Sequence, residues 1–195
     1  MCSGFEKAIN SLHSSMKYDI YITGSNAFLL SSDLATLFTG RTYEIEVFPF
    51  SYKECLKYYD GQYSLDRYVR EGGMPGTLLY REKDDKYKYI RDVFETLIIK
   101  DITNKYSIRN KEVIHDLAYF MMDNISSLTS ANNISKSLAN ANIKITDKTI
   151  KLYMQYLKDS YLFYKVRRYD IKRKKCLATN DKYYLSDHSF RYAII

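Results

Sequence analysis

The sequence is poor in the residues that build cross-links and metal sites. It has three cysteines, three histidines and no tryptophan among its 195 residues. Cys2, Cys55 and Cys176 are odd in number and far apart, which excludes a disulfide framework and a CxxC-type zinc site. We therefore predict that all three are free thiols.

Residues suited to catalysis are equally scarce. His13, His115 and His188 have no cysteine or carboxylate at the spacing of a metal site or a catalytic triad, so a structural role is predicted for each. The pattern GxxxxGKS/T is absent, and with it the loop of backbone N–H groups and lysine that holds ATP phosphates. The chain alone is not expected to hydrolyse ATP.

Long apolar runs are absent as well. No segment approaches the roughly 20 apolar residues needed to cross a bilayer. Residues 1–16 have neither a basic leader nor an uninterrupted apolar stretch. These absences predict a cytoplasmic protein without a membrane partner.

The residues that are present are typical of a folded protein. Hydrophobic residues make up 46% of the chain and charged residues 27%, which lies outside the range of disordered chains. The 21 tyrosines bring apolar area together with hydroxyls that need partners when buried. A length of 195 residues fits one domain or two small ones, and we expect two.

The positive charge is confined to the second half of the chain. Residues 1–99 contain 12 Lys and Arg against 14 Asp and Glu, whereas residues 100–195 contain 18 against 9. This asymmetry favours contact between the second half and a polyanion, and a basic face that serves only solubility is the alternative.

The first part of the chain has an α/β pattern. Apolar spacing predicts a helix over residues 4–16 with one buried stripe. A β-branched and aromatic run predicts a strand over 18–23, and a short helix over 32–39 is expected to end at Gly40 in a left-handed conformation. Alternating residues predict a second, half-buried strand over 42–48.

The middle of the chain is predicted to be helical. A capping box at 51–54 predicts a helix over 52–59, and helical spacing continues over 65–71. Two glycines, a methionine and a proline at 72–75 indicate a hinge or a tight crossing. The longest periodic stretch predicts a single helix over 84–106.

The last part of the chain changes to three helices and a strand pair. Helices are predicted over 111–124, 130–139 and 147–158, and strands over 162–169 and 182–185. This order is typical of a winged helix-turn-helix.

In a winged helix the third helix reads the nucleic acid, and the hairpin follows the backbone. The uncommitted face of the third helix carries Lys148, Lys151, Gln155 and Lys158, which suit phosphates and base edges. The basic residues of the hairpin are Arg167, Arg168, Lys172, Arg173, Lys174 and Lys175. The alternatives are a solvated basic loop and a protein interface lined by the pair Tyr153 and Tyr156.

Several short motifs carry a resemblance to a known family. Residues 20–32 read IYITGSNAFLLSS, residues 37–41 read LFTGR and residues 47–51 read VFPFS. Further matches are GGMP at 72–75, KDI at 100–102 and KYYLSD at 182–187. Through these motifs almost the whole chain resembles a prokaryotic AAA-superfamily ATPase family.

The resemblance implies roles for three residues near the start of the chain. The strand that ends in TGSN is the family's sensor strand, which implies that Ser25 or Asn26 senses the γ-phosphate. Arg41 matches the arginine of the family's SGR/TGR element, where a guanidinium can neutralise charge on a transferring phosphoryl group. The alternatives are that Asn26 caps a helix and that Arg41 pairs with Glu44 or Glu46.

The chain also departs from the family. The phosphate-binding strand and loop and the acidic strand that holds Mg²⁺ belong upstream of Phe5, and a nuclease-like region follows the position of Ile195. We therefore expect an internal fragment of a parent protein that uses ATP and Mg²⁺, with neither bound by the fragment alone.

The resulting expectation is a mixed α/β, mostly helical chain. Residues 1–58 are predicted to be the C-terminal part of a P-loop AAA-type domain, 59–109 a helical lid or linker, and 110–195 a winged helix-turn-helix domain. The expected function is a nucleotide-sensing remnant with a winged helix, and the alternatives are a nucleic-acid-binding module or a protein-interaction adaptor. The unpaired edge of the predicted strand over 18–23 also predicts a homodimer.

Overall fold

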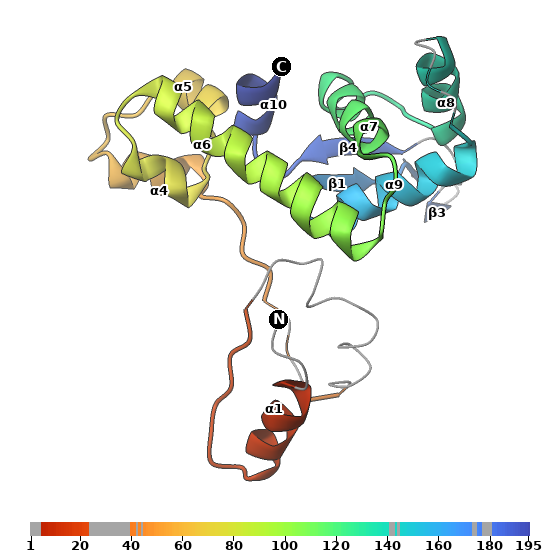
Figure 1. Cartoon of the computed structure of the whole chain (residues 1–195). Helices are drawn as coiled ribbons and strands as arrows, with labels where there is room; N and C mark the ends of the chain where they lie inside the picture. Colours follow the sequence, from red (N-terminus) through yellow and green to blue (C-terminus); the bar gives the residue numbers. More distant parts are fainter. Residues whose placement is uncertain are drawn as a thin grey trace. The chain divides into compact units, whose positions relative to one another are not determined.

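The computed structural model describes residues 5–23, 40–41, 43, 45–140, 143, 145–172, 175–176 and 181–195, with only the backbone at 98–101, 170 and 175–176. The chain divides into two units, Met1–Glu46 and Val47–Ile195 (Figure 1). The two units are described separately below.

The first unit contains helix α1, Phe5–Ser14, at the position that its apolar spacing predicts. None of its described residues is buried, and Leu12 and Met16 of the expected buried stripe are exposed. Gly40 has a φ of 76°, the left-handed conformation expected of it. The predicted helix over 32–39 lies outside the described residues.

Both strands predicted before residue 50 are wrong for the residues that the structure describes. Residues 18–23, and likewise 43 and 45–48, have no regular secondary structure. Tyr43 and Val47, two of the expected inward-facing side chains, are exposed. A strand is stable only when its backbone groups bond to a neighbour, and the described part of these segments has no such neighbour. The expected sheet edge at 18–23 is therefore not seen, and dimerisation stays a prediction.

The second unit is mostly helical, with two small antiparallel ladders (Figure 1). Its helices are α4 (Tyr52–Tyr58), α5 (Leu65–Glu71), the 3-10 helix η1 (Pro75–Leu79), α6 (Lys83–Glu95), η2 (Thr96–Thr103), α7 (Lys111–Asp123), α8 (Ala131–Asn140), α9 (Asp147–Asp159) and α10 (Ser189–Ile194). Its strands are β1 (Phe163–Val166), β2 (Tyr169–Asp170), β3 (Lys175–Cys176) and β4 (Lys182–Leu185). No helix in the described part of the chain is long and apolar enough to cross a membrane.

Helix starts in this unit follow local hydrogen bonding. The predicted capping box is confirmed, because the Ser51 backbone N–H donates to Glu54 Oε2 over 2.8 Å and the Glu54 N–H donates back to Ser51 Oγ. Thr146, which directly precedes the helix predicted over 147–158, caps α9 by accepting from the Thr149 N–H at 3.2 Å. These caps fix where the chain enters each helix.

The predicted single helix over 84–106 needs a correction. The chain is helical from Lys83, but Thr96–Thr103 forms a π-helix in place of a continued α-helix. This segment is rich in Thr and Ile, whose branched side chains crowd the preceding turn and lower the preference for an α-helix.

One hydrophobic core joins the parts of the second unit. Ile90 and Phe94 of α6 pack in the same cluster as Leu117 of α7 and Ile150 of α9. The packing therefore crosses residue 109, where the sequence predicts a boundary. Phe190 of α10 contacts Phe94, with 6.4 Å between ring centroids. Helix α10 is not among the elements that the sequence predicts.

The predicted tight crossing at residues 72–75 is confirmed. Gly72 has a φ of 70°, and a Cβ there would overlap the carboxylate of Asp187. A Cβ on Gly73 would overlap the backbone carbonyl of Phe50. Asp187 Oδ2 accepts a hydrogen bond of 2.7 Å from the Gly73 N–H. Only glycine allows these segments of the chain to approach each other this closely.

A buried ion network lies beside this crossing. Lys86 is 2% exposed and forms an ion pair with Glu71, which also accepts from Arg67 Nε at 2.8 Å. The Arg67 guanidinium lies 4.9 Å from the ring centroids of both Tyr59 and Tyr63. Burial opposes ionisation of Glu71, but the hydrogen bonds and charges of Arg67 and Lys86 outweigh it and lower the pKa of this carboxyl.

We expect Gly72→Ala to lower the free energy of unfolding by about 2–4 kcal/mol, because the new methyl group meets Asp187 and the backbone is held at positive φ. Urea unfolding followed by circular dichroism measures this loss. Gly61→Ala is the matched control, since Gly61 also has a positive φ but its Cβ position is open. Equal losses for the two variants would contradict a steric role for the Gly72 crossing.

The lowered pKa of Glu71 predicts a dependence of stability on pH. Its ionised form stabilises the folded state fully above the ordinary pKa of 4.5, and this contribution is lost as the pH falls through the lowered pKa. We expect Glu71→Gln to lose about 2–4 kcal/mol at pH 7, where Lys86 stays buried without its partner, and to differ less from the wild type near pH 3.

Denaturant titrations across this pH range measure the difference. Asp66→Asn is the control, because the pair between Asp66 and Arg70 is exposed and should contribute little. A constant difference between Glu71→Gln and the wild type at all pH values would refute the link to ionisation.

Candidate nucleic-acid interface

Helix α9 presents one face to the core and one to solvent. Ile150, Met154 and Leu157 are buried against α7, α8 and β1. The opposite face exposes Lys148 and Lys151. Because α9 is capped by Thr146 and anchored along its apolar stripe, these two lysines project from a rigid element.

The other two predicted reader residues contact a carboxylate. Gln155 Nε2 donates to Asp159 Oδ1 over 2.7 Å, and Lys158 Nζ lies 3.3 Å from the same oxygen. Within the described part of the chain, no ion pair engages Lys148 or Lys151. The four residues therefore divide into an outward pair and a pair held by Asp159.

The sequence carried a signal for Asp159. It lies four residues after Gln155, which places the two side chains on the same helix face. Its carboxylate lowers the positive charge of that face and was not among the predicted site residues.

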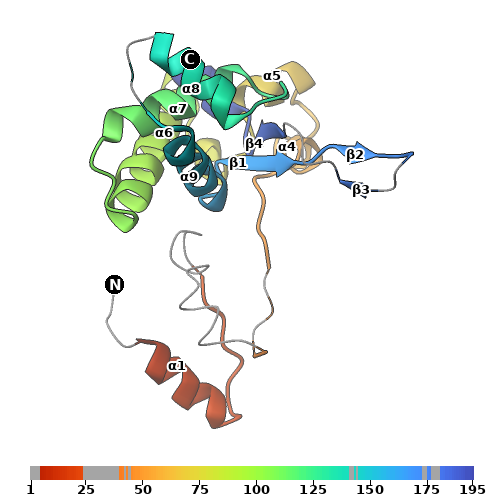
Figure 2. The same ribbon diagram turned by 90° about the vertical axis from the view of Figure 1, so that its right-hand side faces the viewer.

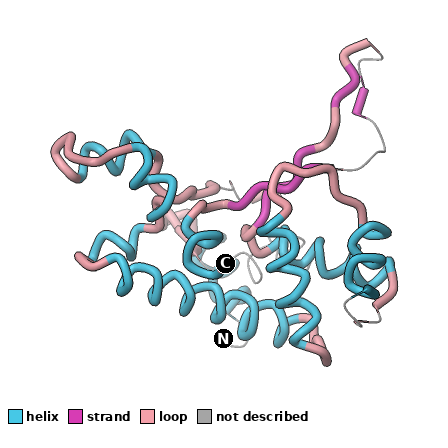
Figure 3. Tube along the Cα trace, turned by 90° about the horizontal axis from the view of Figure 1, so that it is seen from above, coloured by secondary structure: helices cyan, strands magenta, loops and turns pink. Residues whose placement is uncertain are grey.

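The hairpin extends from the helical body as a separate arm. Phe163 pairs with Leu185 and Val166 with Lys182 in the antiparallel β1–β4 ladder, and β2 pairs with β3 further along. Figures 2 and 3 show β2 and β3 projecting away from the helices of this unit. We call residues 165–176 the basic arm, because they contain seven Lys and Arg against one acidic residue.

The described side chains of the basic arm differ in their surroundings. Arg167, Arg168 and Lys172 are exposed. Lys165, at the base of the arm, instead pairs with Asp181 at 2.7 Å. Arg173 and Lys174 lie outside the described residues, and for Lys175 only the backbone position in β3 is described.

The tyrosines considered as a protein interface have internal partners. The rings of Tyr156 and Tyr106 stack with 3.5 Å between centroids, and Tyr153 lies 6.2 Å from Tyr156. Burial raises the pKa of both Tyr106 and Tyr156. The stack joins α9 to the residues that follow η2.

The residues predicted to sense a nucleotide are only partly described. Ser25 and Asn26 lie outside the described residues, as does Glu44. Arg41 is exposed in a bend. Among the described residues there is no group of three or more His, Cys, Asp or Glu side chains that could hold a metal ion.

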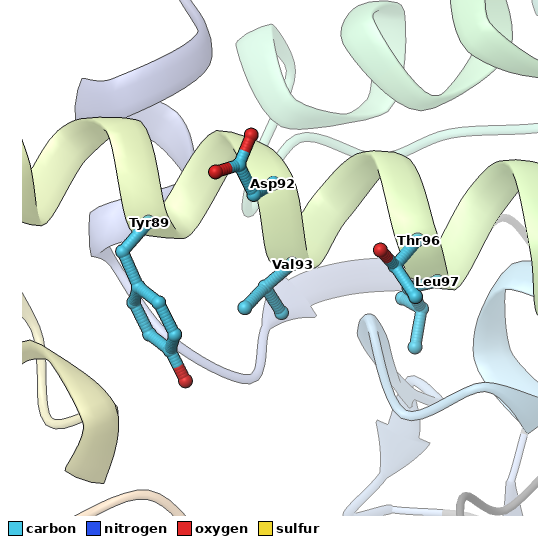
Figure 4. Close-up of a pocket in the computed structure, with 5 residues that line it drawn as sticks. All are labelled: Tyr89, Asp92, Val93, Thr96 and Leu97. Carbon is cyan, nitrogen blue, oxygen red and sulfur yellow. The ribbon is translucent and has the colours of Figure 1, made fainter.

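A shallow groove runs along α6 and the start of η2. It is lined by Tyr89, Asp92, Val93, Thr96 and Leu97, and Tyr89, Val93 and Leu97 lie along the same side of the helix (Figure 4). One carboxylate and two hydroxyls, those of Tyr89 and Thr96, do not make the convergent polar set of a small-molecule site. The groove lacks the basic side chains of the α9 face.

Two family models match the chain in adjacent segments. The model described as an AAA domain matches residues 1–56. The model described as a domain of unknown function (DUF8612) matches residues 62–195, which is more than half of the chain. No solved structure matches.

Two curated proteins are similar over nearly the whole chain. An uncharacterized protein of Haemophilus influenzae is 34% identical over 195 residues, which cover 96% of this chain and 48% of that protein. An uncharacterized protein of Methanocaldococcus jannaschii is 26% identical over 204 residues, which cover 97% of this chain and 46% of that protein. The chain spans about half the length of the curated relatives it matches.

These matches support an AAA-superfamily relation for the first 56 residues, in agreement with the resemblance carried by the motifs. Over its longer part, the chain belongs to the DUF8612 domain family.

Proposed function

We propose that this chain is part of an AAA-type ATP-binding protein and that residues 110–195 form a winged helix that binds the phosphate backbone of duplex nucleic acid. The AAA-domain match over residues 1–56 supports the first part. The order α7, α8, α9 and the antiparallel β1–β4 pair supports the second. The observation that carries the proposal is the outward placement of Lys148 and Lys151 on a core-anchored helix that contacts β1, the strand from which the basic arm extends.

The chemistry of the α9 face favours phosphates over bases. Lysine is a compact, flexible point charge that binds phosphate oxygens and can also donate to a guanine edge, so Gln155 is the one side chain of the four with a planar amide for bidentate readout. Gln155 is bonded to Asp159 and would have to break this bond to reach a base edge. We therefore expect binding that depends strongly on salt and weakly on sequence.

We expect ATP to act only in the longer parent protein. There, Ser25, Asn26 and Arg41 would respond to ATP bound with Mg²⁺. Of these three residues the structure describes only Arg41, whose exposed guanidinium is available to a phosphate, and no group of three or more His, Cys, Asp or Glu side chains among the described residues could hold Mg²⁺. Nucleic-acid binding by this chain is accordingly assigned to its own basic residues without nucleotide.

A second candidate function is a protein-interaction adaptor. The groove along Tyr89, Val93 and Leu97 favours it, because half-buried apolar side chains along one helix face suit a protein partner. A stable protein complex that persists at high salt, together with no affinity for duplexes, would support the adaptor over the winged-helix proposal.

We expect the double substitution Lys148→Ala and Lys151→Ala to weaken duplex binding about tenfold and to reduce the slope of log K against log salt by about 1–2, because two phosphate contacts are lost. Fluorescence anisotropy with a labelled duplex, at several salt concentrations, measures both quantities. Lys53→Ala with Lys57→Ala is the matched control, since these exposed lysines have the same net charge effect on α4. If both double variants change the slope equally, α9 is not the contact surface.

Removing the carboxylate of Asp159 should have the opposite effect. We expect Asp159→Asn to strengthen duplex binding a few-fold, because the side chains of Gln155 and Lys158 lose the charged group that holds them. The NaCl concentration needed for elution from heparin provides an independent readout. Asp84→Asn makes the same charge change at an exposed site on α6 and should give a smaller shift. Equal shifts would show a general charge effect only.

A further inference from the structure

The β1–β4 ladder has an outer face that turns away from α9. Strand residues alternate between faces, and Phe163 and Tyr183 are the buried members on the side that packs on the core. The other side carries Tyr164 directly opposite Tyr184, and Val166 directly opposite Lys182. Tyr184 is 37% exposed and Val166 is 49% exposed.

Two further rings extend this outer face. Phe48 lies against Tyr164 with 5.9 Å between ring centroids, and Tyr161 lies 6.4 Å from the same ring. Phe48 is 58% exposed. We call Phe48, Tyr161, Tyr164 and Tyr184 the aromatic face. Phe48 and Tyr184 are its exposed members, and exposed large apolar side chains that gather on one surface are typical of a binding surface.

Positive charge borders the aromatic face. Lys182 is exposed on the ladder itself, and the exposed Arg167 and Arg168 follow directly after β1. Beyond them the chain continues into the rest of the basic arm. Accessible rings and adjacent cations together suit a ligand that has flat unsaturated groups on a negatively charged chain.

We propose that the aromatic face binds unpaired bases of a single-stranded nucleic acid while Arg167, Arg168 and Lys182 contact its phosphates. Bases stack on aromatic side chains largely irrespective of sequence, and Arg and Lys follow the backbone. A duplex does not offer this contact, because its base faces are covered by their neighbours in the stack. Helix α9 packs against the other side of β1, so this surface is separate from Lys148 and Lys151.

This inference shares the basic arm with the proposed function, and its test therefore uses the rings. The full chain is titrated into a fluorescein-labelled oligothymidylate of about 20 nucleotides, and anisotropy is recorded. We expect Tyr184→Leu combined with Phe48→Leu to weaken binding roughly tenfold, because leucine keeps apolar area but cannot stack on a base. Tyr58→Leu combined with Tyr119→Leu is the control, since both tyrosines are exposed and their ring contacts, with Tyr59 and Phe94, lie outside the aromatic face.

Photocrosslinking gives a second measurement that does not depend on substitutions. An oligonucleotide containing 5-iodouracil should crosslink to Tyr184 or Phe48, and peptide mass spectrometry identifies the modified residue. Far-ultraviolet circular dichroism establishes that each variant is folded. Equal affinity for the oligothymidylate in the folded Tyr184/Phe48 variant and the wild type, crosslinks confined to other segments, or no binding of the oligothymidylate overturns the inference.

The two proposals can fail separately. Loss of duplex binding in the Lys148/Lys151 variant, with oligothymidylate binding kept, supports separate surfaces. Binding of the oligothymidylate by a wild-type chain that does not bind duplexes would overturn the proposed duplex function and support the aromatic face. Duplex binding that is intact in the Tyr184/Phe48 variant, with the oligothymidylate lost, supports both.

Discussion

The second unit depends on the buried carboxylate of Asp187. Its Oδ2 accepts from the Gly73 N–H, and its Oδ1 accepts from the backbone N–H and the hydroxyl of Ser189. A carboxylate taken out of water costs several kcal/mol unless its oxygens are bonded in this way. Asp187 is 3% exposed, so its bonds fix the start of α10 against the glycine crossing. The two glycines are needed because any Cβ would occupy the space of Asp187 or of the Phe50 backbone.

This joint explains why the β1–β4 ladder can support the basic arm. A two-stranded ladder is marginal by itself. Here β4 leads within two residues to Asp187, and its outer edge is bonded where the Ser126 N–H donates to the Tyr183 carbonyl and Thr129 bridges Asp181. The inner face rests on α9. The β1–β4 ladder is thus held by Asp187, by the bonds to Ser126 and Thr129, and by α9. It gives the basic arm a rigid base, so that a bound ligand does not displace the arm.

The success of the sequence-based predictions follows from which interactions are local. The helix starts at Ser51 and Thr146 were predictable, because a cap is decided within four residues. The motifs GGMP and KYYLSD could be recognised, but only the fold shows that Gly73 and Asp187, 114 residues apart, bond to each other. The strands predicted before residue 50 failed because a strand depends on a neighbour that local pattern does not supply. Helix α10 could not be predicted for the same reason, because this short helix depends on the packing of Phe190 against Phe94.

The charge of the candidate site also depends on contacts that the sequence does not show. The sequence indicates which residues of α9 and the hairpin are basic, but only the fold shows that Asp159 bonds to Gln155 and Lys158 and that Asp181 pairs with Lys165. Lys148, Lys151, Arg167 and Arg168, by contrast, are exposed. Charges that are spread along an edge and an arm match the spacing of a phosphate backbone better than the edge of one base pair. Asp159 and Asp181 thus neutralise part of the positive charge of α9 and the hairpin. Lys148, Lys151, Arg167 and Arg168 remain where a long polyanion can reach them.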